Sequence, residues 1–268
     1  QTWAQLTATA QKIQDAERAA GNDKFWGYVW QGRAYEGLTC NALEWIASYN
    51  GGVLVEPDGK ISVNNPRAAK AIAQAKPWVN TITPPGVLNY TEEESRGVFQ
   101  AGNALFMRNW PYAWGLSQGV DSPVKGKVGT APLPKGGDDG RHAATLGGWQ
   151  MSVSNYSANR DAAIALVLYL TGPEVQKQRA VELSQLPTLV KLYDDPDVVK
   201  ANPFFAEMKD ILAGAVARPA TVTGSKYNQV SSEFFNAVYA ALSGGKTAEQ
   251  SLSDLEASLK RLSRGGKW

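Results

Sequence analysis

The densest group of ligand-binding side chains is the run Arg108-Asn109-Trp110-Pro111-Tyr112-Ala113-Trp114-Gly115, where three large aromatics fall within five positions. Aromatic rings offer flat apolar faces, and Arg, Asn and Tyr side chains can form a polar rim around them. This combination suits a ligand with alternating C–H and O–H surfaces, and therefore predicts a sugar. The alternative is that Trp110, Tyr112 and Trp114 are core residues, because aromatic side chains fill much of any protein interior.

A second candidate position, Trp149, follows two glycines within the stretch Thr145 to Val153. Glycine lets a ligand or another backbone come close. Gly147 and Gly148 are therefore expected either to lend backbone groups to a ligand or only to make room for one.

Around these positions the chain is predicted to be mostly helical, with scattered short strands. Apolar and aromatic runs predict strands at residues 25–30, 104–107 and 128–131, and a hairpin around the Pro-Asp-Gly turn within residues 53–63. Apolar spacing and capping residues predict helices at residues 3–16, 38–48, 66–75, 92–101, 161–170, 173–183, 203–212, 229–242 and 248–262, and a further helical stretch that opens at residues 194–196. Leucines at heptad-like spacing in the last helix also leave open a helical interaction module.

Composition limits the class of protein. The chain has 268 residues, enough for one large domain or two of typical size, and its nine Trp and ten Tyr exceed what a core alone requires. The net charge is only +2, and the one notable basic cluster is terminal, which argues against nucleic acid as a partner. There is no apolar run of about 18 residues to span a membrane.

The sequence offers no catalytic or metal-binding constellation, so we expect no enzyme, no metal and no cofactor. A glycoside hydrolase needs two carboxylates flanking a bond, but Glu36 and Glu44 lie at and just after one helix start. The single histidine, His142, is predicted to lie in a loop, and the single cysteine, Cys40, is predicted to be a buried apolar residue. One cysteine also excludes an internal disulfide.

Five stretches together resemble a known family in the same order along nearly the whole chain. They are Tyr35-Glu36-Gly37-Leu38, Phe106 to Trp114, Leu146-Gly147-Gly148-Trp149, Leu186-Pro187-Thr188 and Arg218-Pro219. The chain resembles the extracellular solute-binding proteins of carbohydrate ABC importers, and most closely their trehalose/maltose-binding branch. The resemblance implies an α/β fold of the periplasmic-binding-protein type (type II), with a helix-rich second lobe and a partial first lobe.

The resemblance also implies roles for particular residues. Tyr112 and Trp149 would stack on sugar rings, one from each side of a cleft, with Trp110 and Trp114 as further stacking candidates. Arg218 and Glu36 would bond sugar hydroxyls, and the remaining pocket candidates are Tyr35, Gln31, Gly147 and Gly148. Each has an ordinary alternative: core packing for the rings, a surface ion pair for Arg218, a helix-start charge for Glu36, and surface positions for Tyr35 and Gln31.

One departure from the family pattern concerns length. Family members usually begin with roughly a hundred further residues, a typical length for an α/β domain. The chain is therefore expected to be a fragment, a dissected piece or half of a split protein, with a separate chain as one source of the missing first lobe. Residues 1–142 and 196–268 would form the second lobe, and residues 143–195 would return into the first lobe and expose apolar surface there.

These observations together predict a protein that binds an α-linked disaccharide and hands it to the membrane subunits of an ABC importer by hinge closure. Its predicted location is periplasmic or extracellular, in association with the membrane. A glycan-acting enzyme such as a glycoside hydrolase is the alternative function.

Overall fold

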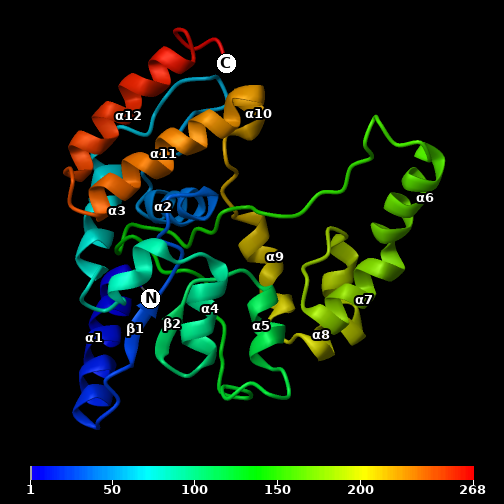
Figure 1. Ribbon diagram of the computed structural model, residues 1–268, viewed down its shortest axis with the longest axis horizontal. Coiled ribbons are helices and arrows are strands. Elements are labelled where there is room, and N and C mark those ends of the chain that lie inside the picture. Colours follow the sequence, from blue (N-terminus) through cyan, green and yellow to red (C-terminus); the bar gives the residue numbers. More distant parts are fainter. Residues whose placement is uncertain (1) are drawn as a thin grey trace. The chain divides into compact units, whose positions relative to one another are not determined.

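The computed structural model describes residues 2–268, in which helices dominate (Figure 1). The α-helices are α1 (Trp3–Ala19), α2 (Glu36–Ser48), α3 (Pro66–Ala75), α4 (Glu92–Gln100), α5 (Tyr112–Ser117), α6 (Arg160–Leu170), α7 (Pro173–Leu183), α8 (Pro196–Ala201), α9 (Phe205–Ala213), α10 (Ala220–Thr223), α11 (Tyr227–Leu242) and α12 (Ala248–Leu262). Short 3-10 helices cover Lys76–Trp78, Pro85–Asn89, Val190–Asp194 and Gly224–Lys226. The strands are β1 (Trp26–Val29) and β2 (Ala104–Met107). Within the described residues, no helix is long and apolar enough to cross a bilayer.

The chain folds into two compact units, each of which is described by itself. Unit 1 comprises Gln1–Asn109, Ala131–Leu146 and Gly214–Trp268, and unit 2 comprises Trp110–Thr130 and Gly147–Ala213. The chain therefore passes between units several times. The assignment of residues 1–142, 143–195 and 196–268 to the lobes of a binding protein stays a prediction.

Unit 1 is built around a cluster of large aromatic rings. Trp78 lies at its centre, with ring centroids 5.4 Å from Trp3, 5.7 Å from Tyr28 and 5.7 Å from Trp45. The last two pairs meet edge to face, a geometry that adds about 0.5–1.5 kcal/mol per pair beyond burial. Much of the aromatic excess in the sequence thus serves the core.

In unit 1 the two strands pair with each other, and helix α3 follows from local sequence. β1 and β2 pair in parallel, with Tyr28 opposite Phe106, and α1 and α4 pack beside them (Figure 1). α3 begins where it is predicted, because Asn65 accepts hydrogen bonds from the amides of Arg67 and Ala68 and proline occupies the first turn.

The last two helices lie side by side and close the core of unit 1 (Figure 1). Leu252, Leu255 and Leu259 of α12 are buried in that core. The heptad-like spacing of these leucines therefore serves packing within unit 1. It no longer supports the alternative that α12 is a helical interaction module.

The hairpin predicted within residues 53–63 is confirmed in a minimal form. Its turn is closed by one antiparallel bridge, Val55 to Ile61, where the Glu56 amide donates to the Lys60 carbonyl. The strand predicted at residues 128–131 is wrong, because those residues form no strand. In residues 145–153 the pairing is confined to a parallel bridge between Thr145 and Val216. Apolar sequence makes these segments extended, but a strand also needs a neighbour to accept its backbone hydrogen bonds.

Unit 2 has a small core of its own. Ala180, Tyr193, Val198, Phe204 and Phe205 are buried together. Burial raises the pKa of Tyr193 to about 12. The phenol hydroxyl of this residue donates to the Pro187 carbonyl at 2.8 Å, so its one polar group is satisfied. Helix α6 belongs to unit 2 and contributes no buried residue to this core.

Candidate functional site

Arg108, predicted to lie at the rim of an aromatic binding surface, is instead buried in unit 1. Its Nε donates to Glu44 Oε2 at 2.9 Å, its Nη2 donates to Glu44 Oε1, and its Nη1 donates to Gln31 Oε1 at 3.0 Å. The Arg108 and Glu44 side chains are only 3% and 2% exposed. Burial alone lowers the pKa of the guanidinium, but the Glu44 carboxylate more than offsets this, so the pKa lies above its ordinary value.

Hydrogen bonds to Glu44 and Cys40 hold two segments of the chain, around Arg108 and around Thr145, against α2. Glu44 lies within α2, and its Oε1 also accepts the backbone amide of Thr145 at 3.1 Å. The Thr145 hydroxyl donates to the Cys40 carbonyl at 2.9 Å, also on α2. The segments that leave unit 1 after Asn109 and after Leu146 are thus both anchored to one helix.

Gln31 lies in the interior of unit 1 and not at a surface. Its side chain is fully buried, and its amide donates to the Arg108 carbonyl at 3.0 Å. Asn41 donates to the same amide's oxygen at 3.1 Å. The polar groups of Gln31 are therefore used to satisfy the buried ion pair and its surroundings.

Glu36 and Arg218, the two predicted hydroxyl-binding residues of unit 1, contact each other. Arg218 Nη1 donates to Glu36 Oε1 at 2.6 Å, and the two side chains are 25% and 41% exposed. The hydroxyls of Tyr227 and Ser231 also donate to the Glu36 carboxylate. The pair is thus a half-exposed polar cluster at the start of α2 and the first turns of α11.

Tyr227 and Ser231 were missed by the sequence analysis. They lie four residues apart and so share one face of α11, but nothing in the sequence alone connects that face to Glu36, almost 200 positions away. Burial and the Glu36 carboxylate raise the pKa of Tyr227 above its ordinary value, so the phenol stays protonated and remains a donor.

Tyr35 is bound to another element of unit 1. Its hydroxyl donates to Glu92 Oε2 at 2.7 Å, at the start of α4. Burial and this carboxylate hold the pKa of Tyr35 above its ordinary value. Tyr35 is half-buried, and its hydroxyl is engaged by Glu92 and does not face solvent as a free donor.

The aromatic candidates of unit 2 differ sharply in exposure. Trp149 is fully exposed, whereas Tyr112 begins α5 and is half-buried. Trp114 packs edge to face on Phe204 with ring centroids 5.4 Å apart, which is the core role predicted as its alternative. Trp110 lies against Gly147, because a Cβ at residue 147 would stand 2.9 Å from the indole Cη2.

The two glycines before Trp149 differ in the space around them. A side chain at Gly147 would require the Trp110 ring to shift, so glycine permits this close approach as the structure has it. A Cβ at Gly148 would meet no atom within 4 Å, so space alone does not require glycine there. Gly148 thus leaves the backbone beside Trp149 open.

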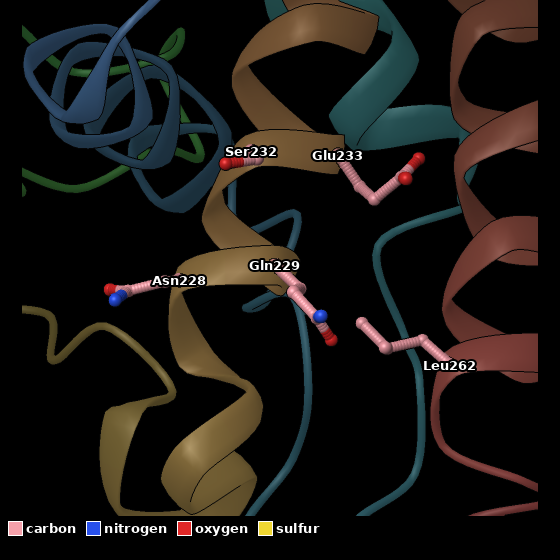
Figure 2. A pocket seen from close by; sticks show the side chains of 5 residues that line it. All are labelled: Asn228, Gln229, Ser232, Glu233 and Leu262. Atoms are coloured by element: carbon pink, nitrogen blue, oxygen red, sulfur yellow. The ribbon is translucent and has the colours of Figure 1, made fainter.

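A recess of about 420 Å³ lies elsewhere, between α11 and α12 of unit 1. It is lined by Asn228, Gln229, Ser232, Glu233 and Leu262. Figure 2 shows the Gln229 side chain directed across it toward Leu262. The recess contains none of the predicted ligand-binding residues. Among described residues, no group of three or more His, Cys, Asp or Glu side chains could hold a metal ion.

The model of the bacterial extracellular solute-binding protein family matches residues 1–177. A relative from Deinococcus radiodurans, described as a probable ABC transporter-binding protein, is 53% identical over 100% of this chain and 63% of its own length. Maltose-bound MalE3 of T. maritima is 39% identical with a TM-score of 0.89, over 97% of this chain and 65% of that one. A solute-binding protein of Thermotoga lettingae, bound with α-D-tagatose, has a TM-score of 0.83 at 22% identity, over 98% of this chain and 64% of that one, and shows likeness of fold alone.

The chain belongs to the bacterial extracellular solute-binding proteins. Its α/β fold is that of the periplasmic binding proteins, so the family and fold class predicted from the sequence are confirmed. Family membership supports a periplasmic or extracellular location. The chain spans less than two thirds of the length of the relatives compared with it.

Proposed function

We propose that this chain carries sugar-contacting residues of a protein that binds an α-linked disaccharide, of the trehalose or maltose type, and delivers it to ABC importer subunits at the membrane. The D. radiodurans relative is described as a transporter-binding protein, and MalE3, at 39% identity, was solved with maltose bound. Both descriptions support a binding role over a catalytic one.

The observation that carries the proposal is the full exposure of Trp149. An indole ring in water contributes nothing to the core and costs solvation free energy. Its neighbour Gly148 leaves the adjacent backbone uncovered. A pyranose would cover the indole with its C–H face while its hydroxyls stay hydrogen-bonded at the ring edge.

The polar group of unit 1 suits hydroxyl recognition. Arg218 and Glu36 are both partly exposed, and together they present guanidinium donors and carboxylate acceptors. Tyr227 and Ser231 hold the Glu36 carboxylate in place, which pre-organises it for a ligand. We propose Tyr227 and Ser231 as positioning residues for Glu36.

The remaining candidate residues differ in the contacts that already engage their side chains. Tyr112, Trp110, Gly147 and Gly148 lie in segments with accessible surface and keep a proposed place against the sugar. Trp114 packs on Phe204, and Gln31 accepts a hydrogen bond from Arg108 of the buried ion pair. Tyr35 would need to release Glu92 before it could bond a hydroxyl.

The test is titration calorimetry with maltose, trehalose and sucrose. It compares this chain with a chimera that adds the part of the D. radiodurans relative outside the matched region. We expect Trp149→Ala in the chimera to weaken disaccharide binding by about ten-fold, or about 1.4 kcal/mol. Tyr156→Ala is the matched control, because Tyr156 is a fully exposed aromatic of the same segment that is not predicted to contact sugar.

Binding of none of the three sugars by the folded chimera would overturn the proposal. Binding that is present in the chimera and lost in the shorter chain would support it, and would indicate that the binding residues here are an incomplete set. Release of product from a chromogenic disaccharide would instead favour the glycoside hydrolase.

A further inference from the structure

A buried carboxylate of α2 bonds two segments of the chain close to where they leave unit 1. The guanidinium of Arg108 donates to both oxygens of Glu44, and Glu44 Oε1 also accepts the backbone amide of Thr145 at 3.1 Å. The first two segments of unit 1 end at Asn109 and Leu146, one residue beyond these two partners. Because burying two charges costs solvation free energy that apolar side chains would not, packing alone does not account for this pair.

The backbone beside each partner is also held within unit 1. The Arg108 amide donates to the Val29 carbonyl of β1 at 3.0 Å. On the other segment, the Val216 amide donates to the Ala144 carbonyl at 2.8 Å, and the Leu146 amide donates to the Val216 carbonyl at 2.9 Å. Both segments are therefore fixed in unit 1 by main-chain bonds as well as through the carboxylate.

Very little chain separates these fixed points from the aromatic segments. Trp110 comes two residues after Arg108, and Gly147 comes two residues after Thr145. Two residues of extended chain span at most about 7 Å, so Trp110 and Gly147 stay near the residues that are bonded to the carboxylate. The two segments meet at these positions, because a Cβ at Gly147 would stand 2.9 Å from the indole Cη2 of Trp110. Bonding to one carboxylate thus keeps the beginnings of the two aromatic segments together.

We propose that Glu44 is a positioning residue for the sugar site, which holds the segments that carry Tyr112 and Trp149 together at their beginnings. Each of these rings follows two residues after the contact between Trp110 and Gly147. A carboxylate suits this task, because its two oxygens accept a guanidinium and an amide at once, whereas an apolar pair of equal volume bonds neither. A fixed spacing lets a sugar bind without first ordering the two segments. The effect on sugar affinity rests on the proposed function, whereas the spacing itself can be measured without sugar.

The first measurement uses this chain and needs no sugar. Hydrogen exchange at the Leu146 amide and fluorine NMR of fluorotryptophan at position 110, assigned with Trp110→Phe, are compared between the unaltered chain and Glu44→Gln with Arg108→Met. This double variant leaves no uncompensated charge in the core. Leu255→Ala is the matched control, because it opens a cavity in the same core from α12, which packs on α11 and α3. We expect the Leu146 amide to exchange at least about ten-fold faster in the double variant than in the control, with a displaced Trp110 signal in the double variant alone.

The second measurement is titration calorimetry with maltose, in the chimera that adds the unmatched part of the D. radiodurans relative. Glu44→Gln with Arg108→Met should weaken maltose binding by at least about ten-fold, whereas Leu255→Ala should leave it unchanged. Arg108→Lys keeps a cation but offers one nitrogen where the guanidinium bonds Glu44 through two. Its affinity should therefore fall between those of the unaltered chimera and the double variant. A loss of stability alone would act on the control as well, so this order of affinities reports positioning.

Two results would overturn the inference. One is a double variant whose Leu146 exchange and Trp110 signal match those of the control, and the other is an equal change of maltose affinity in the double variant and the control. A chimera that binds none of maltose, trehalose and sucrose would refute the proposed function alone. In that case faster exchange at Leu146 with a displaced Trp110 signal would still show that Glu44 holds the two segments together.

Discussion

Replacing Arg108 by methionine should destabilise unit 1 far more than replacing a surface cation. Glu44 and Arg108 are almost completely buried, and two of the guanidinium's nitrogens bond the carboxylate. In Arg108→Met the Glu44 carboxylate keeps the Thr145 amide as its partner but loses its counter-charge. Breaking a buried pair from one side costs about 3–5 kcal/mol, which is a large part of a typical total stability of about 5–15 kcal/mol.

The loss is measured by urea unfolding followed through tryptophan fluorescence. Urea is uncharged and so does not screen the ion pair, and Trp3, Trp45 and Trp78 report from the core of unit 1. The control is Lys260→Met, which breaks the exposed pair between Lys260 and Glu256 and should cost at most about 0.5 kcal/mol.

A double variant separates the charge effect from lost packing. Glu44→Gln with Arg108→Met removes both charges, so it should be less destabilised than Arg108→Met alone, because no uncompensated charge remains buried. The reasoning is refuted if Arg108→Met costs less than about 1 kcal/mol or if the double variant is the less stable of the two.

Three further predictions concern stability and reactivity. Trp149→Ala should change the unfolding free energy by no more than about 0.5 kcal/mol, whereas Trp45→Ala should cost about 3–5 kcal/mol, both measured by urea unfolding; a large loss at Trp149 would show a packing role. Burial raises the pKa of the Cys40 thiol to about 12, so a disulfide reagent at about pH 8 should label unfolded protein and spare folded protein; rapid labelling of folded protein would contradict the burial. Asn65→Ala removes the cap of α3 and should lower stability by about 1 kcal/mol in thermal unfolding, and an unchanged midpoint would show that the cap is dispensable.

Local sequence determined most of the helices. α3 and α12 begin after the predicted capping residues and end where predicted, because caps, proline positions and apolar spacing act within a few residues. The same local patterns predicted a hairpin in residues 53–63, which forms with a single antiparallel bridge, and a strand in residues 128–131, which does not form. A strand depends on a neighbour that its own sequence does not specify.

Arg108 illustrates the limit of reading residue types in order. That order was enough to predict the family and to single out Trp149 behind its two glycines. It did not reveal that Arg108 and Gln31 belong to a buried ion-pair network, or that Tyr227 and Ser231 hold Glu36. Those roles follow from contacts between residues 64 to 195 positions apart, and whether a charge meets its partner or meets water is settled only when the elements pack.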